Sequence, residues 1–146
     1  MDCWPKVDVA QRGTGGDGEA MQKGNGMVLV VEDDGDLLQM VQLVLEGAGY
    51  RTTAASEGGE ALARIAEGMP SVILLDMKMP GMDGWEFARR FRELHDRSAP
   101  LVVLTAAENA RQRAEEIGAE DYLGKPFDID ALLDKVGRYA EAETVP

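Results

Sequence analysis

Apolar positions along the chain follow two different periods. Short continuous apolar runs, typical of buried strands, alternate with segments in which apolar residues return every three or four positions, as on one helix face. The runs predict strands at residues 27–32, 50–55, 72–76, 101–105 and 119–123. The periodic segments predict helices at residues 36–47, 57–67, 84–95 and 107–117, followed by a last helix that Asp128 caps.

Each predicted helix except the weakly apolar fourth has a clear apolar face for burial against a sheet. The predicted buried residues are Leu37, Val41, Val44 and Leu45 in the first helix, Ala61, Leu62 and Ile65 in the second, Phe87, Ala88, Phe91 and Leu94 in the third, and Ile129, Leu132, Leu133 and Val136 in the last. Five successive strand–helix units favour a parallel sheet with helices on both faces, because each crossover returns to the same edge with the same hand. The pattern therefore predicts an α/β fold.

The first 26 residues differ from the rest of the chain. They are rich in glycine and show neither a strand period nor a helix period, so we expect a disordered N-terminal tail. The whole chain has 146 residues, of which 45% are hydrophobic, enough for one domain with an ordinary core. We place that domain at residues 27–143.

Composition narrows the class of partner. The formal net charge is -12, with 27 acidic and 15 basic residues, which argues against nonspecific nucleic-acid binding and favours a protein partner. Cys3 is the only cysteine, so an intrachain disulfide cannot form. No apolar stretch has the length of a transmembrane helix or a signal-peptide core. We therefore expect a cytoplasmic chain without a membrane partner.

Carboxylates gather where two of the predicted strands end. Glu32, Asp33 and Asp34 follow the first strand, and Asp76 ends the third. In parallel sheets of this kind, sites form at the carboxyl ends of the strands, and several carboxylates meeting there would repel one another strongly without a cation. Hard oxygen ligands, with no cluster of histidine or cysteine, indicate Mg²⁺ rather than zinc or copper.

The other strand ends supply groups that suit phosphoryl transfer. An aspartate nucleophile such as Asp76 must approach an anionic phosphoryl group, and a cation held by Glu32, Asp33 and Asp76 would offset their repulsion. Thr105 ends the fourth strand and could donate its hydroxyl hydrogen to a phosphoryl oxygen. Lys125, just beyond the fifth strand, could bind a further oxygen as a compact point charge.

Four motifs in order resemble the response-regulator receiver domain of two-component signalling. The resemblance covers about Met27 to Glu141, and its motifs are Val30-Val31-Glu32-Asp33-Asp34, residues 74–84 around Asp76, Leu104-Thr105-Ala106, and Tyr122-Leu123-Gly124-Lys125-Pro126-Phe127. Each motif lies at the strand end where the family has it. The resemblance implies a doubly wound five-stranded parallel sheet with five helices, in the flavodoxin-like strand order 2-1-3-4-5.

The resemblance also implies a role for each residue of the predicted metal and phosphoryl site. Asp76 would accept a phosphoryl group from a histidine kinase or a histidine phosphotransfer protein. Glu32 and Asp33 would anchor Mg²⁺ together with Asp76, and the backbone carbonyl of Lys78 would be another ligand. Lys125 would contact the phosphoryl group.

Further residues would turn phosphorylation into a signal. By the same resemblance, Thr105 and Tyr122 would move inward together and change the surface of the fourth helix, fifth strand and fifth helix. An alternative is that Tyr122 only fills the core. Asp34 would start the first helix, and the Lys125–Pro126 peptide bond would be cis.

We therefore expect a phosphorylatable switch rather than an enzyme, without an attached output domain, that signals by contact with a downstream protein. One alternative is a magnesium-dependent aspartyl-phosphate phosphohydrolase, which usually needs a second aspartate two residues after the nucleophile, where this chain has Lys78. The other alternative is a flavodoxin-like electron carrier. That class needs a hydroxyl-rich phosphate loop after the first strand, and the acidic residues there would repel the FMN phosphate.

Overall fold

The computed structural model describes residues 26–140, in which five strands alternate with five helices. The elements are β1 (Met27–Val31), α1 (Gly35–Gly47), β2 (Arg51–Ala55), α2 (Gly58–Glu67), β3 (Val72–Asp76), α3 (Gly84–His95), β4 (Leu101–Ala106), α4 (Ala107–Ile117), β5 (Asp121–Lys125) and α5 (Ile129–Ala140). The predicted disordered tail, apart from Gly26, and the last three residues of the predicted domain lie outside the described residues. Within the described part, no helix has the length and apolar character that crossing a membrane requires.

The five strands form one sheet in the order β2-β1-β3-β4-β5, and every neighbouring pair is parallel. The predicted α/β class and strand order are therefore confirmed. Val31 pairs with Leu75, so Glu32 leaves β1 level with Asp76 at the end of β3. Asp76 in turn pairs with Leu104 of β4. The carboxyl ends of the three central strands thus meet at one edge of the sheet.

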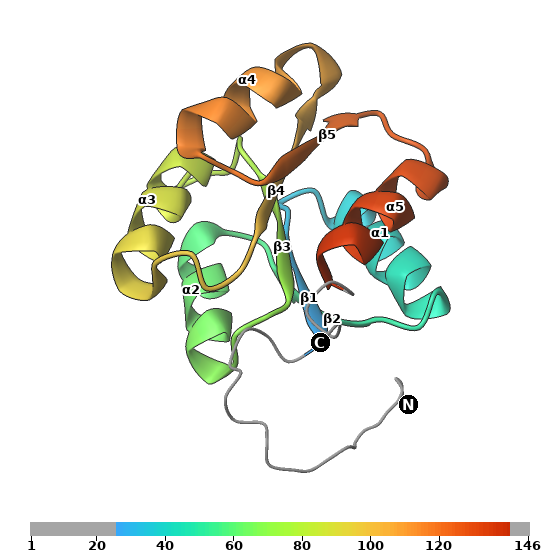
Figure 1. The fold of residues 1–146 in the computed structure, drawn as a ribbon, viewed down its shortest axis with the longest axis horizontal. Helices are drawn as coiled ribbons and strands as arrows, with labels where there is room; N and C mark the ends of the chain where they lie inside the picture. The colour runs from blue at the N-terminus through green and yellow to red at the C-terminus, as the bar shows by residue number, and fades with distance from the viewer. Residues whose placement is uncertain (1–25, 141–146) are drawn as a thin grey trace.

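Helices cover both faces of the sheet (Figure 1). α1 and α5 pack on one face, where they meet strand residues such as Val28 and Val30. α2, α3 and α4 pack on the other face, which includes Leu29 and Val31. Successive residues of a strand point to opposite faces, so each central strand serves both cores. This explains why β3 reads as a continuous apolar run, since all five of its residues are buried.

Two of the predicted buried residues are exposed. Leu94 is 66% exposed and Ile129 is 51% exposed, so both predictions are wrong. In the last turn of α3, the ring that packs on buried Phe91 is that of His95, at 5.6 Å between centroids. Ile129 is the first residue of α5, and the buried face of that helix begins only at Leu132.

The last strand begins two residues later than the sequence predicted. Gly118 adopts a left-handed conformation (φ 66°) that closes α4, and the N–H of Ala119 bonds to the Ala114 carbonyl at 2.9 Å. The helix end therefore occupies these residues, and pairing with β4 starts where Asp121 meets Val102. Lys125 is consequently the last residue of β5 and not a residue beyond it.

Asp34 begins α1, as predicted. Its carboxylate accepts hydrogen bonds from the backbone N–H groups of Asp36 at 3.1 Å and Leu37 at 3.2 Å, which an N-terminal helical turn otherwise leaves without partners. The side chain of Asp34 is thereby oriented toward the helix, and this separates its role from that of Asp33.

Candidate functional site

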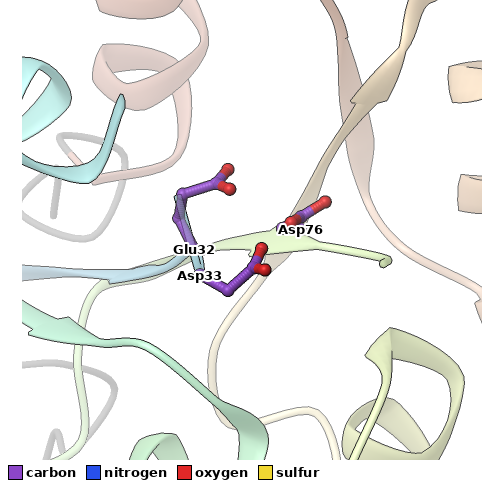
Figure 2. Close-up of side chains that lie close together, drawn as sticks. All are labelled: Glu32, Asp33 and Asp76. Carbon is purple, nitrogen blue, oxygen red and sulfur yellow. The ribbon is translucent and has the colours of Figure 1, made fainter. Parts of the chain in front are cut away.

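Three carboxylates converge where β1 and β3 end. Glu32 and Asp33 follow β1, Asp76 ends β3, and one oxygen of each lies within 4.8 Å of the others (Figure 2). Glu32 is 1% exposed and Asp76 is 4% exposed, whereas Asp33 is open to solvent. A hard divalent cation takes oxygen ligands of this kind, so the donor set fits the predicted Mg²⁺. The side of the site that carries Asp33 is the side from which a cation could enter.

Lys125 brings a positive charge to the two buried carboxylates. Its Nζ donates a hydrogen bond to Glu32 Oε1 at 2.9 Å and lies 3.6 Å from Asp76 Oδ1. Burial opposes the charged form of Lys125, but the hydrogen bond to Glu32 and the charge of Asp76 outweigh it and raise the pKa of the ammonium group. Lys125 therefore stays charged at neutral pH, beside the predicted phosphoacceptor.

Burial and a neighbouring negative charge disfavour the ionised form of Asp76. Burial and the nearby charge of Glu32 raise its pKa to about 7, although Lys125 and the Lys78 backbone N–H favour the ionised form. The Lys78 N–H donates to Asp76 Oδ1 at 3.3 Å and fixes the carboxylate at the start of the following loop. Without a cation, part of the Asp76 population is protonated near neutral pH. A bound divalent cation would favour the ionised, nucleophilic form.

Thr105 and Tyr122 lie on the two strands that follow β3 in the sheet. Thr105 is buried, one residue beyond the Leu104 that pairs with Asp76, and it pairs with Gly124 of β5. Tyr122 is 37% exposed, so the alternative in which it only fills the core is wrong. The Lys125–Pro126 peptide bond is cis, as the resemblance implied.

One residue that positions the site was not singled out from the sequence. A Cβ on Gly84 would lie 2.7 Å from Met77 Cα and 3.2 Å from the Asp76 carbonyl oxygen, so only glycine fits there without a shift. α3 therefore begins in direct contact with the residue after Asp76. The signal was present in the sequence as an Asp83-Gly84 pair, in which Asp83 caps α3 by accepting from the Glu86 N–H at 3.0 Å.

Residues 28–137 match the family model of the response regulator receiver domain. The chain belongs to this family. The solved structure of a putative response regulator from Chloroflexus aurantiacus superposes with a TM-score of 0.74 at 34% identity, covering 80% of this chain and 98% of that one. The chemotaxis response regulator CheY4 of Vibrio cholerae gives a TM-score of 0.70 at 35% identity, over 78% of this chain and 98% of that one.

Curated relatives differ in how much of their length the receiver domain spans. Sporulation initiation phosphotransferase F of Bacillus subtilis is 35% identical over 117 residues, which cover 79% of this chain and 94% of the relative. The uncharacterized transcriptional regulatory protein YkoG, also of Bacillus subtilis, is 40% identical over 118 residues, or 80% of this chain but only 50% of YkoG. The match to the regulator NtrC of Salmonella typhimurium, at 39% identity over 77% of this chain, covers 24% of that protein. What the longer relatives do through their remaining sequence therefore does not transfer to this chain.

The different positions of Asp33 and Asp34 predict different effects on the metal. Asp33→Ala should weaken Mg²⁺ binding strongly, because it removes the solvent-facing oxygen of the three-carboxylate cluster. Asp34→Ala should leave Mg²⁺ binding nearly unchanged but lower the free energy of unfolding by about 1 kcal/mol through the lost cap. Calorimetric titration with Mg²⁺ and urea unfolding of both variants would measure the two effects. Equal losses of Mg²⁺ affinity would contradict this division of roles.

Proposed function

We propose that the chain is a phosphorylatable signalling switch that accepts a phosphoryl group on Asp76 from a histidine kinase or a histidine phosphotransfer protein. The observation that carries the proposal is the position of Asp76, a buried carboxylate that ends β3 beside the Lys125 ammonium group and two further carboxylates. Membership of the receiver family supports the switch over the phosphohydrolase and the electron carrier. The proposal retains the cytoplasmic location predicted from the sequence.

The residues of the site divide the chemistry between them. An ionised Asp76 oxygen attacks phosphorus, the bond from phosphorus to the donor imidazole nitrogen breaks with its electron pair staying on nitrogen, and an acyl phosphate forms. Glu32, Asp33, Asp76 and the Lys78 carbonyl would hold Mg²⁺, which when bound supplies positive charge to the transferring oxygens. Lys125 needs to move little to reach a phosphoryl oxygen, because it already lies 3.6 Å from Asp76 Oδ1. The Thr105 hydroxyl would donate a hydrogen bond to another phosphoryl oxygen.

A hollow beside the site leaves room for a protein donor. The hollow has a volume of about 450 Å³ and is lined by Asp34, Leu37, Met40, Ala106, Lys125, Pro126 and Phe127. Met40, which lines the hollow, is 38% exposed, and Leu43, three residues further along α1, is 63% exposed. An apolar surface of this kind is typical of a protein-binding site. It supports a protein donor with an apolar surface around its phosphohistidine over a small molecule alone.

Movements of Thr105 and Tyr122 would link phosphorylation of Asp76 to a change at the protein surface. In the proposal, the phosphoryl oxygen draws the Thr105 hydroxyl toward Asp76, and Tyr122 turns inward into the space that Thr105 leaves. The surface formed by α4, β5 and α5 changes as a result, and a downstream protein recognises the change. The free energy for this shift can come only from contacts that differ between the two states.

Intact-mass analysis tests the phosphoacceptor step directly. Incubation with acetyl phosphate and Mg²⁺ should add the mass of one phosphoryl group, and addition of a chelator should prevent it. A purified histidine phosphotransfer protein charged with phosphate should transfer it to the same site. Failure of every donor to label the folded protein in the presence of Mg²⁺ would reject the proposed function.

The side chain at position 78 should control how long the phosphoryl group lasts. Lys78 is exposed two residues after Asp76, and its ammonium group has no acceptor with which to orient an attacking water. Lys78→Asn adds such an acceptor and should speed phosphate loss by about tenfold, equivalent to about 1.4 kcal/mol in the barrier. Decay of the labelled protein after donor removal measures the rate. Lys78→Met, which supplies no acceptor, is the control, and equal decay of the Asn variant and the parent would contradict the prediction.

A further inference from the structure

We propose that Lys135 of α5 is a positioning residue that holds the Tyr122 ring at the outer edge of β5 when Asp76 carries no phosphoryl group. The inference rests on the proposed role of Tyr122 and deepens it, because it names the contact that the ring must give up on moving inward. Neither Lys135 nor Asp121 belongs to the motifs by which the sequence resembles the family.

The contact that holds the ring is a cation above an aromatic face. Lys135 Nζ lies 5.5 Å from the centroid of the Tyr122 ring, within the range of a cation–π interaction. The same Nζ donates a hydrogen bond to Asp121 Oδ1 at 2.8 Å. Tyr122 is 37% exposed, so the ring lies at the surface beside this ammonium group.

Asp121 fixes where the ammonium group lies. The Asp121 side chain is only 9% exposed, and its two oxygens accept from Lys135, Arg138, Tyr139 and the Tyr122 backbone N–H. Burial opposes its ionised form, but these hydrogen bonds outweigh burial and lower the pKa of the carboxyl group. An oriented carboxylate therefore holds the Lys135 Nζ beside the ring, which a flexible lysine alone would not do.

The sheet register shows that the contact passes around the edge of the sheet. Tyr122 pairs with Val103, which belongs to the core beneath α2, α3 and α4, and paired residues of parallel strands point to the same face. Lys135 lies on α5, which covers the opposite face. β5 is an edge strand with no strand beyond it, so a side chain from α5 can reach the Tyr122 ring around this edge.

The start of α4 packs closely against β5 near Tyr122. Gly124 lies two residues after Tyr122 on the same face and pairs with Thr105. A Cβ on Gly124 would lie 2.5 Å from Ala107 Cα and 2.7 Å from Ala107 Cβ, so the first residue of α4 already fills the space beside Gly124. An inward Tyr122 ring would therefore have to pack beside the start of α4. Lys135 adds a favourable contact to the outward position, and this contact lowers the population of the inward state.

Removal of the positive charge of Lys135 should raise the population of the inward state by a measurable factor. Lys135→Met keeps a long apolar stem and removes the charge, and the lost cation–π contact should raise the inward population about two- to fivefold. The affinity of beryllium fluoride, a phosphoryl mimic, should rise by the same factor, because ligand affinity scales with the fraction of protein in the competent state. If Lys135 only tethered α5 to β5, its substitution by methionine would not raise the affinity for beryllium fluoride.

NMR signals of tyrosine labelled with ¹³C in the ring report the surroundings of the Tyr122 ring. The label does not alter the electronic structure of the ring. The chain has three tyrosines, so Tyr→Phe variants assign their signals. In the parent, beryllium fluoride with Mg²⁺ should move the Tyr122 signal to a new position. In Lys135→Met without ligand, the signal should already lie part of the way there, and a lower concentration of beryllium fluoride should complete the shift.

Two variants serve as controls. Lys135→Arg keeps a cation that can stack on the ring and should behave as the parent does. Arg138→Met removes the other basic group that pairs with Asp121, at 3.2 Å, but leaves the ammonium group beside the ring. Arg138→Met should also give the same Tyr122 signal as the parent. Both controls should retain the parent's affinity for beryllium fluoride.

The outcomes separate this inference from the proposed function. If the parent signal moves with beryllium fluoride while Lys135→Met matches the parent in both signal and affinity, the inference is overturned and the switch stands. If Arg138→Met raises the affinity as much as Lys135→Met does, loss of charge at Asp121 explains the effect and the inference is also overturned. If the parent is phosphorylated but its Tyr122 signal stays in place, both the role of Tyr122 and the inference fail.

Discussion

Asp76→Asn should abolish the addition of a phosphoryl group to the protein. The asparagine side chain has nearly the same shape, and its oxygen can still accept from the Lys78 N–H, which bonds to Asp76 Oδ1 at 3.3 Å. It lacks the negative charge that attacks phosphorus, and an amide cannot form an acyl phosphate. We therefore expect the complete loss of the mass increase that acetyl phosphate and Mg²⁺ produce in the parent, while the fold is retained.

The matched control is the same chemical change at a neighbouring carboxylate. Asp34→Asn keeps the cap of α1, because asparagine is as good an N-cap as aspartate, and it should label at the parent rate. Peptide mapping of the labelled parent should place the phosphoryl group on the segment that contains Asp76. Labelling of Asp76→Asn at the parent rate would reject Asp76 as the acceptor.

The sequence predicted the central strand β3 better than the edge strand β5, and burial explains the difference. β3 is buried along its whole length, so its apolar run marks both ends, and the predicted range 72–76 is the observed one. β5 has only one fully buried residue, Leu123, and its apolar signal is weak. Ala119 looked like a strand residue but serves to close α4. The two-residue error at β5 therefore comes from competition between strand pairing and helix termination.

The same reasoning explains which parts of the site were accessible from the sequence. Because parallel strands bring their carboxyl ends together, the approach of Glu32 and Asp33 to Asp76 follows from the pattern of elements alone. The 2.9 Å contact between Lys125 and Glu32 depends on the reach of a flexible side chain from β5 past β4 and β3, and no periodicity encodes it. The Lys135–Asp121 pair likewise lies outside any motif, since a basic residue at a polar position of an amphipathic helix resembles ordinary solvated surface in the sequence.

The second large effect concerns stability without metal. Asp76→Asn should make the metal-free protein more stable than the parent at pH 8, by on the order of 2 kcal/mol and several degrees in Tm. The cause is the burial of Asp76 beside Glu32, which raises the Asp76 pKa from 3.8 to about 7. The variant removes the buried charge, and Lys125 keeps its partner Glu32 at 2.9 Å.

The pH dependence of this advantage follows from proton linkage. Because the folded pKa of Asp76 lies above its unfolded value, the folded protein binds more protons than the unfolded chain between about pH 4 and pH 7. The free energy of unfolding of the parent therefore falls as the pH rises through this window. The free energy of unfolding of Asp76→Asn does not fall in this way, because asparagine does not titrate. Its advantage over the parent should thus be smaller at pH 5 than at pH 8 and level off above about pH 8.

Urea unfolding in chelator at several pH values measures the difference between the two proteins, in which the titration of unrelated groups cancels. Glu57→Gln removes an equal charge from an exposed side chain that makes no capping hydrogen bond, and it should change stability little. Saturating Mg²⁺ should narrow or reverse the advantage of Asp76→Asn, because a ligand that binds only the folded state stabilises the parent, with its full set of carboxylates, by more. An Asp76→Asn variant that is less stable than the parent in chelator at pH 8 would show that repulsion at this site does not destabilise the metal-free fold.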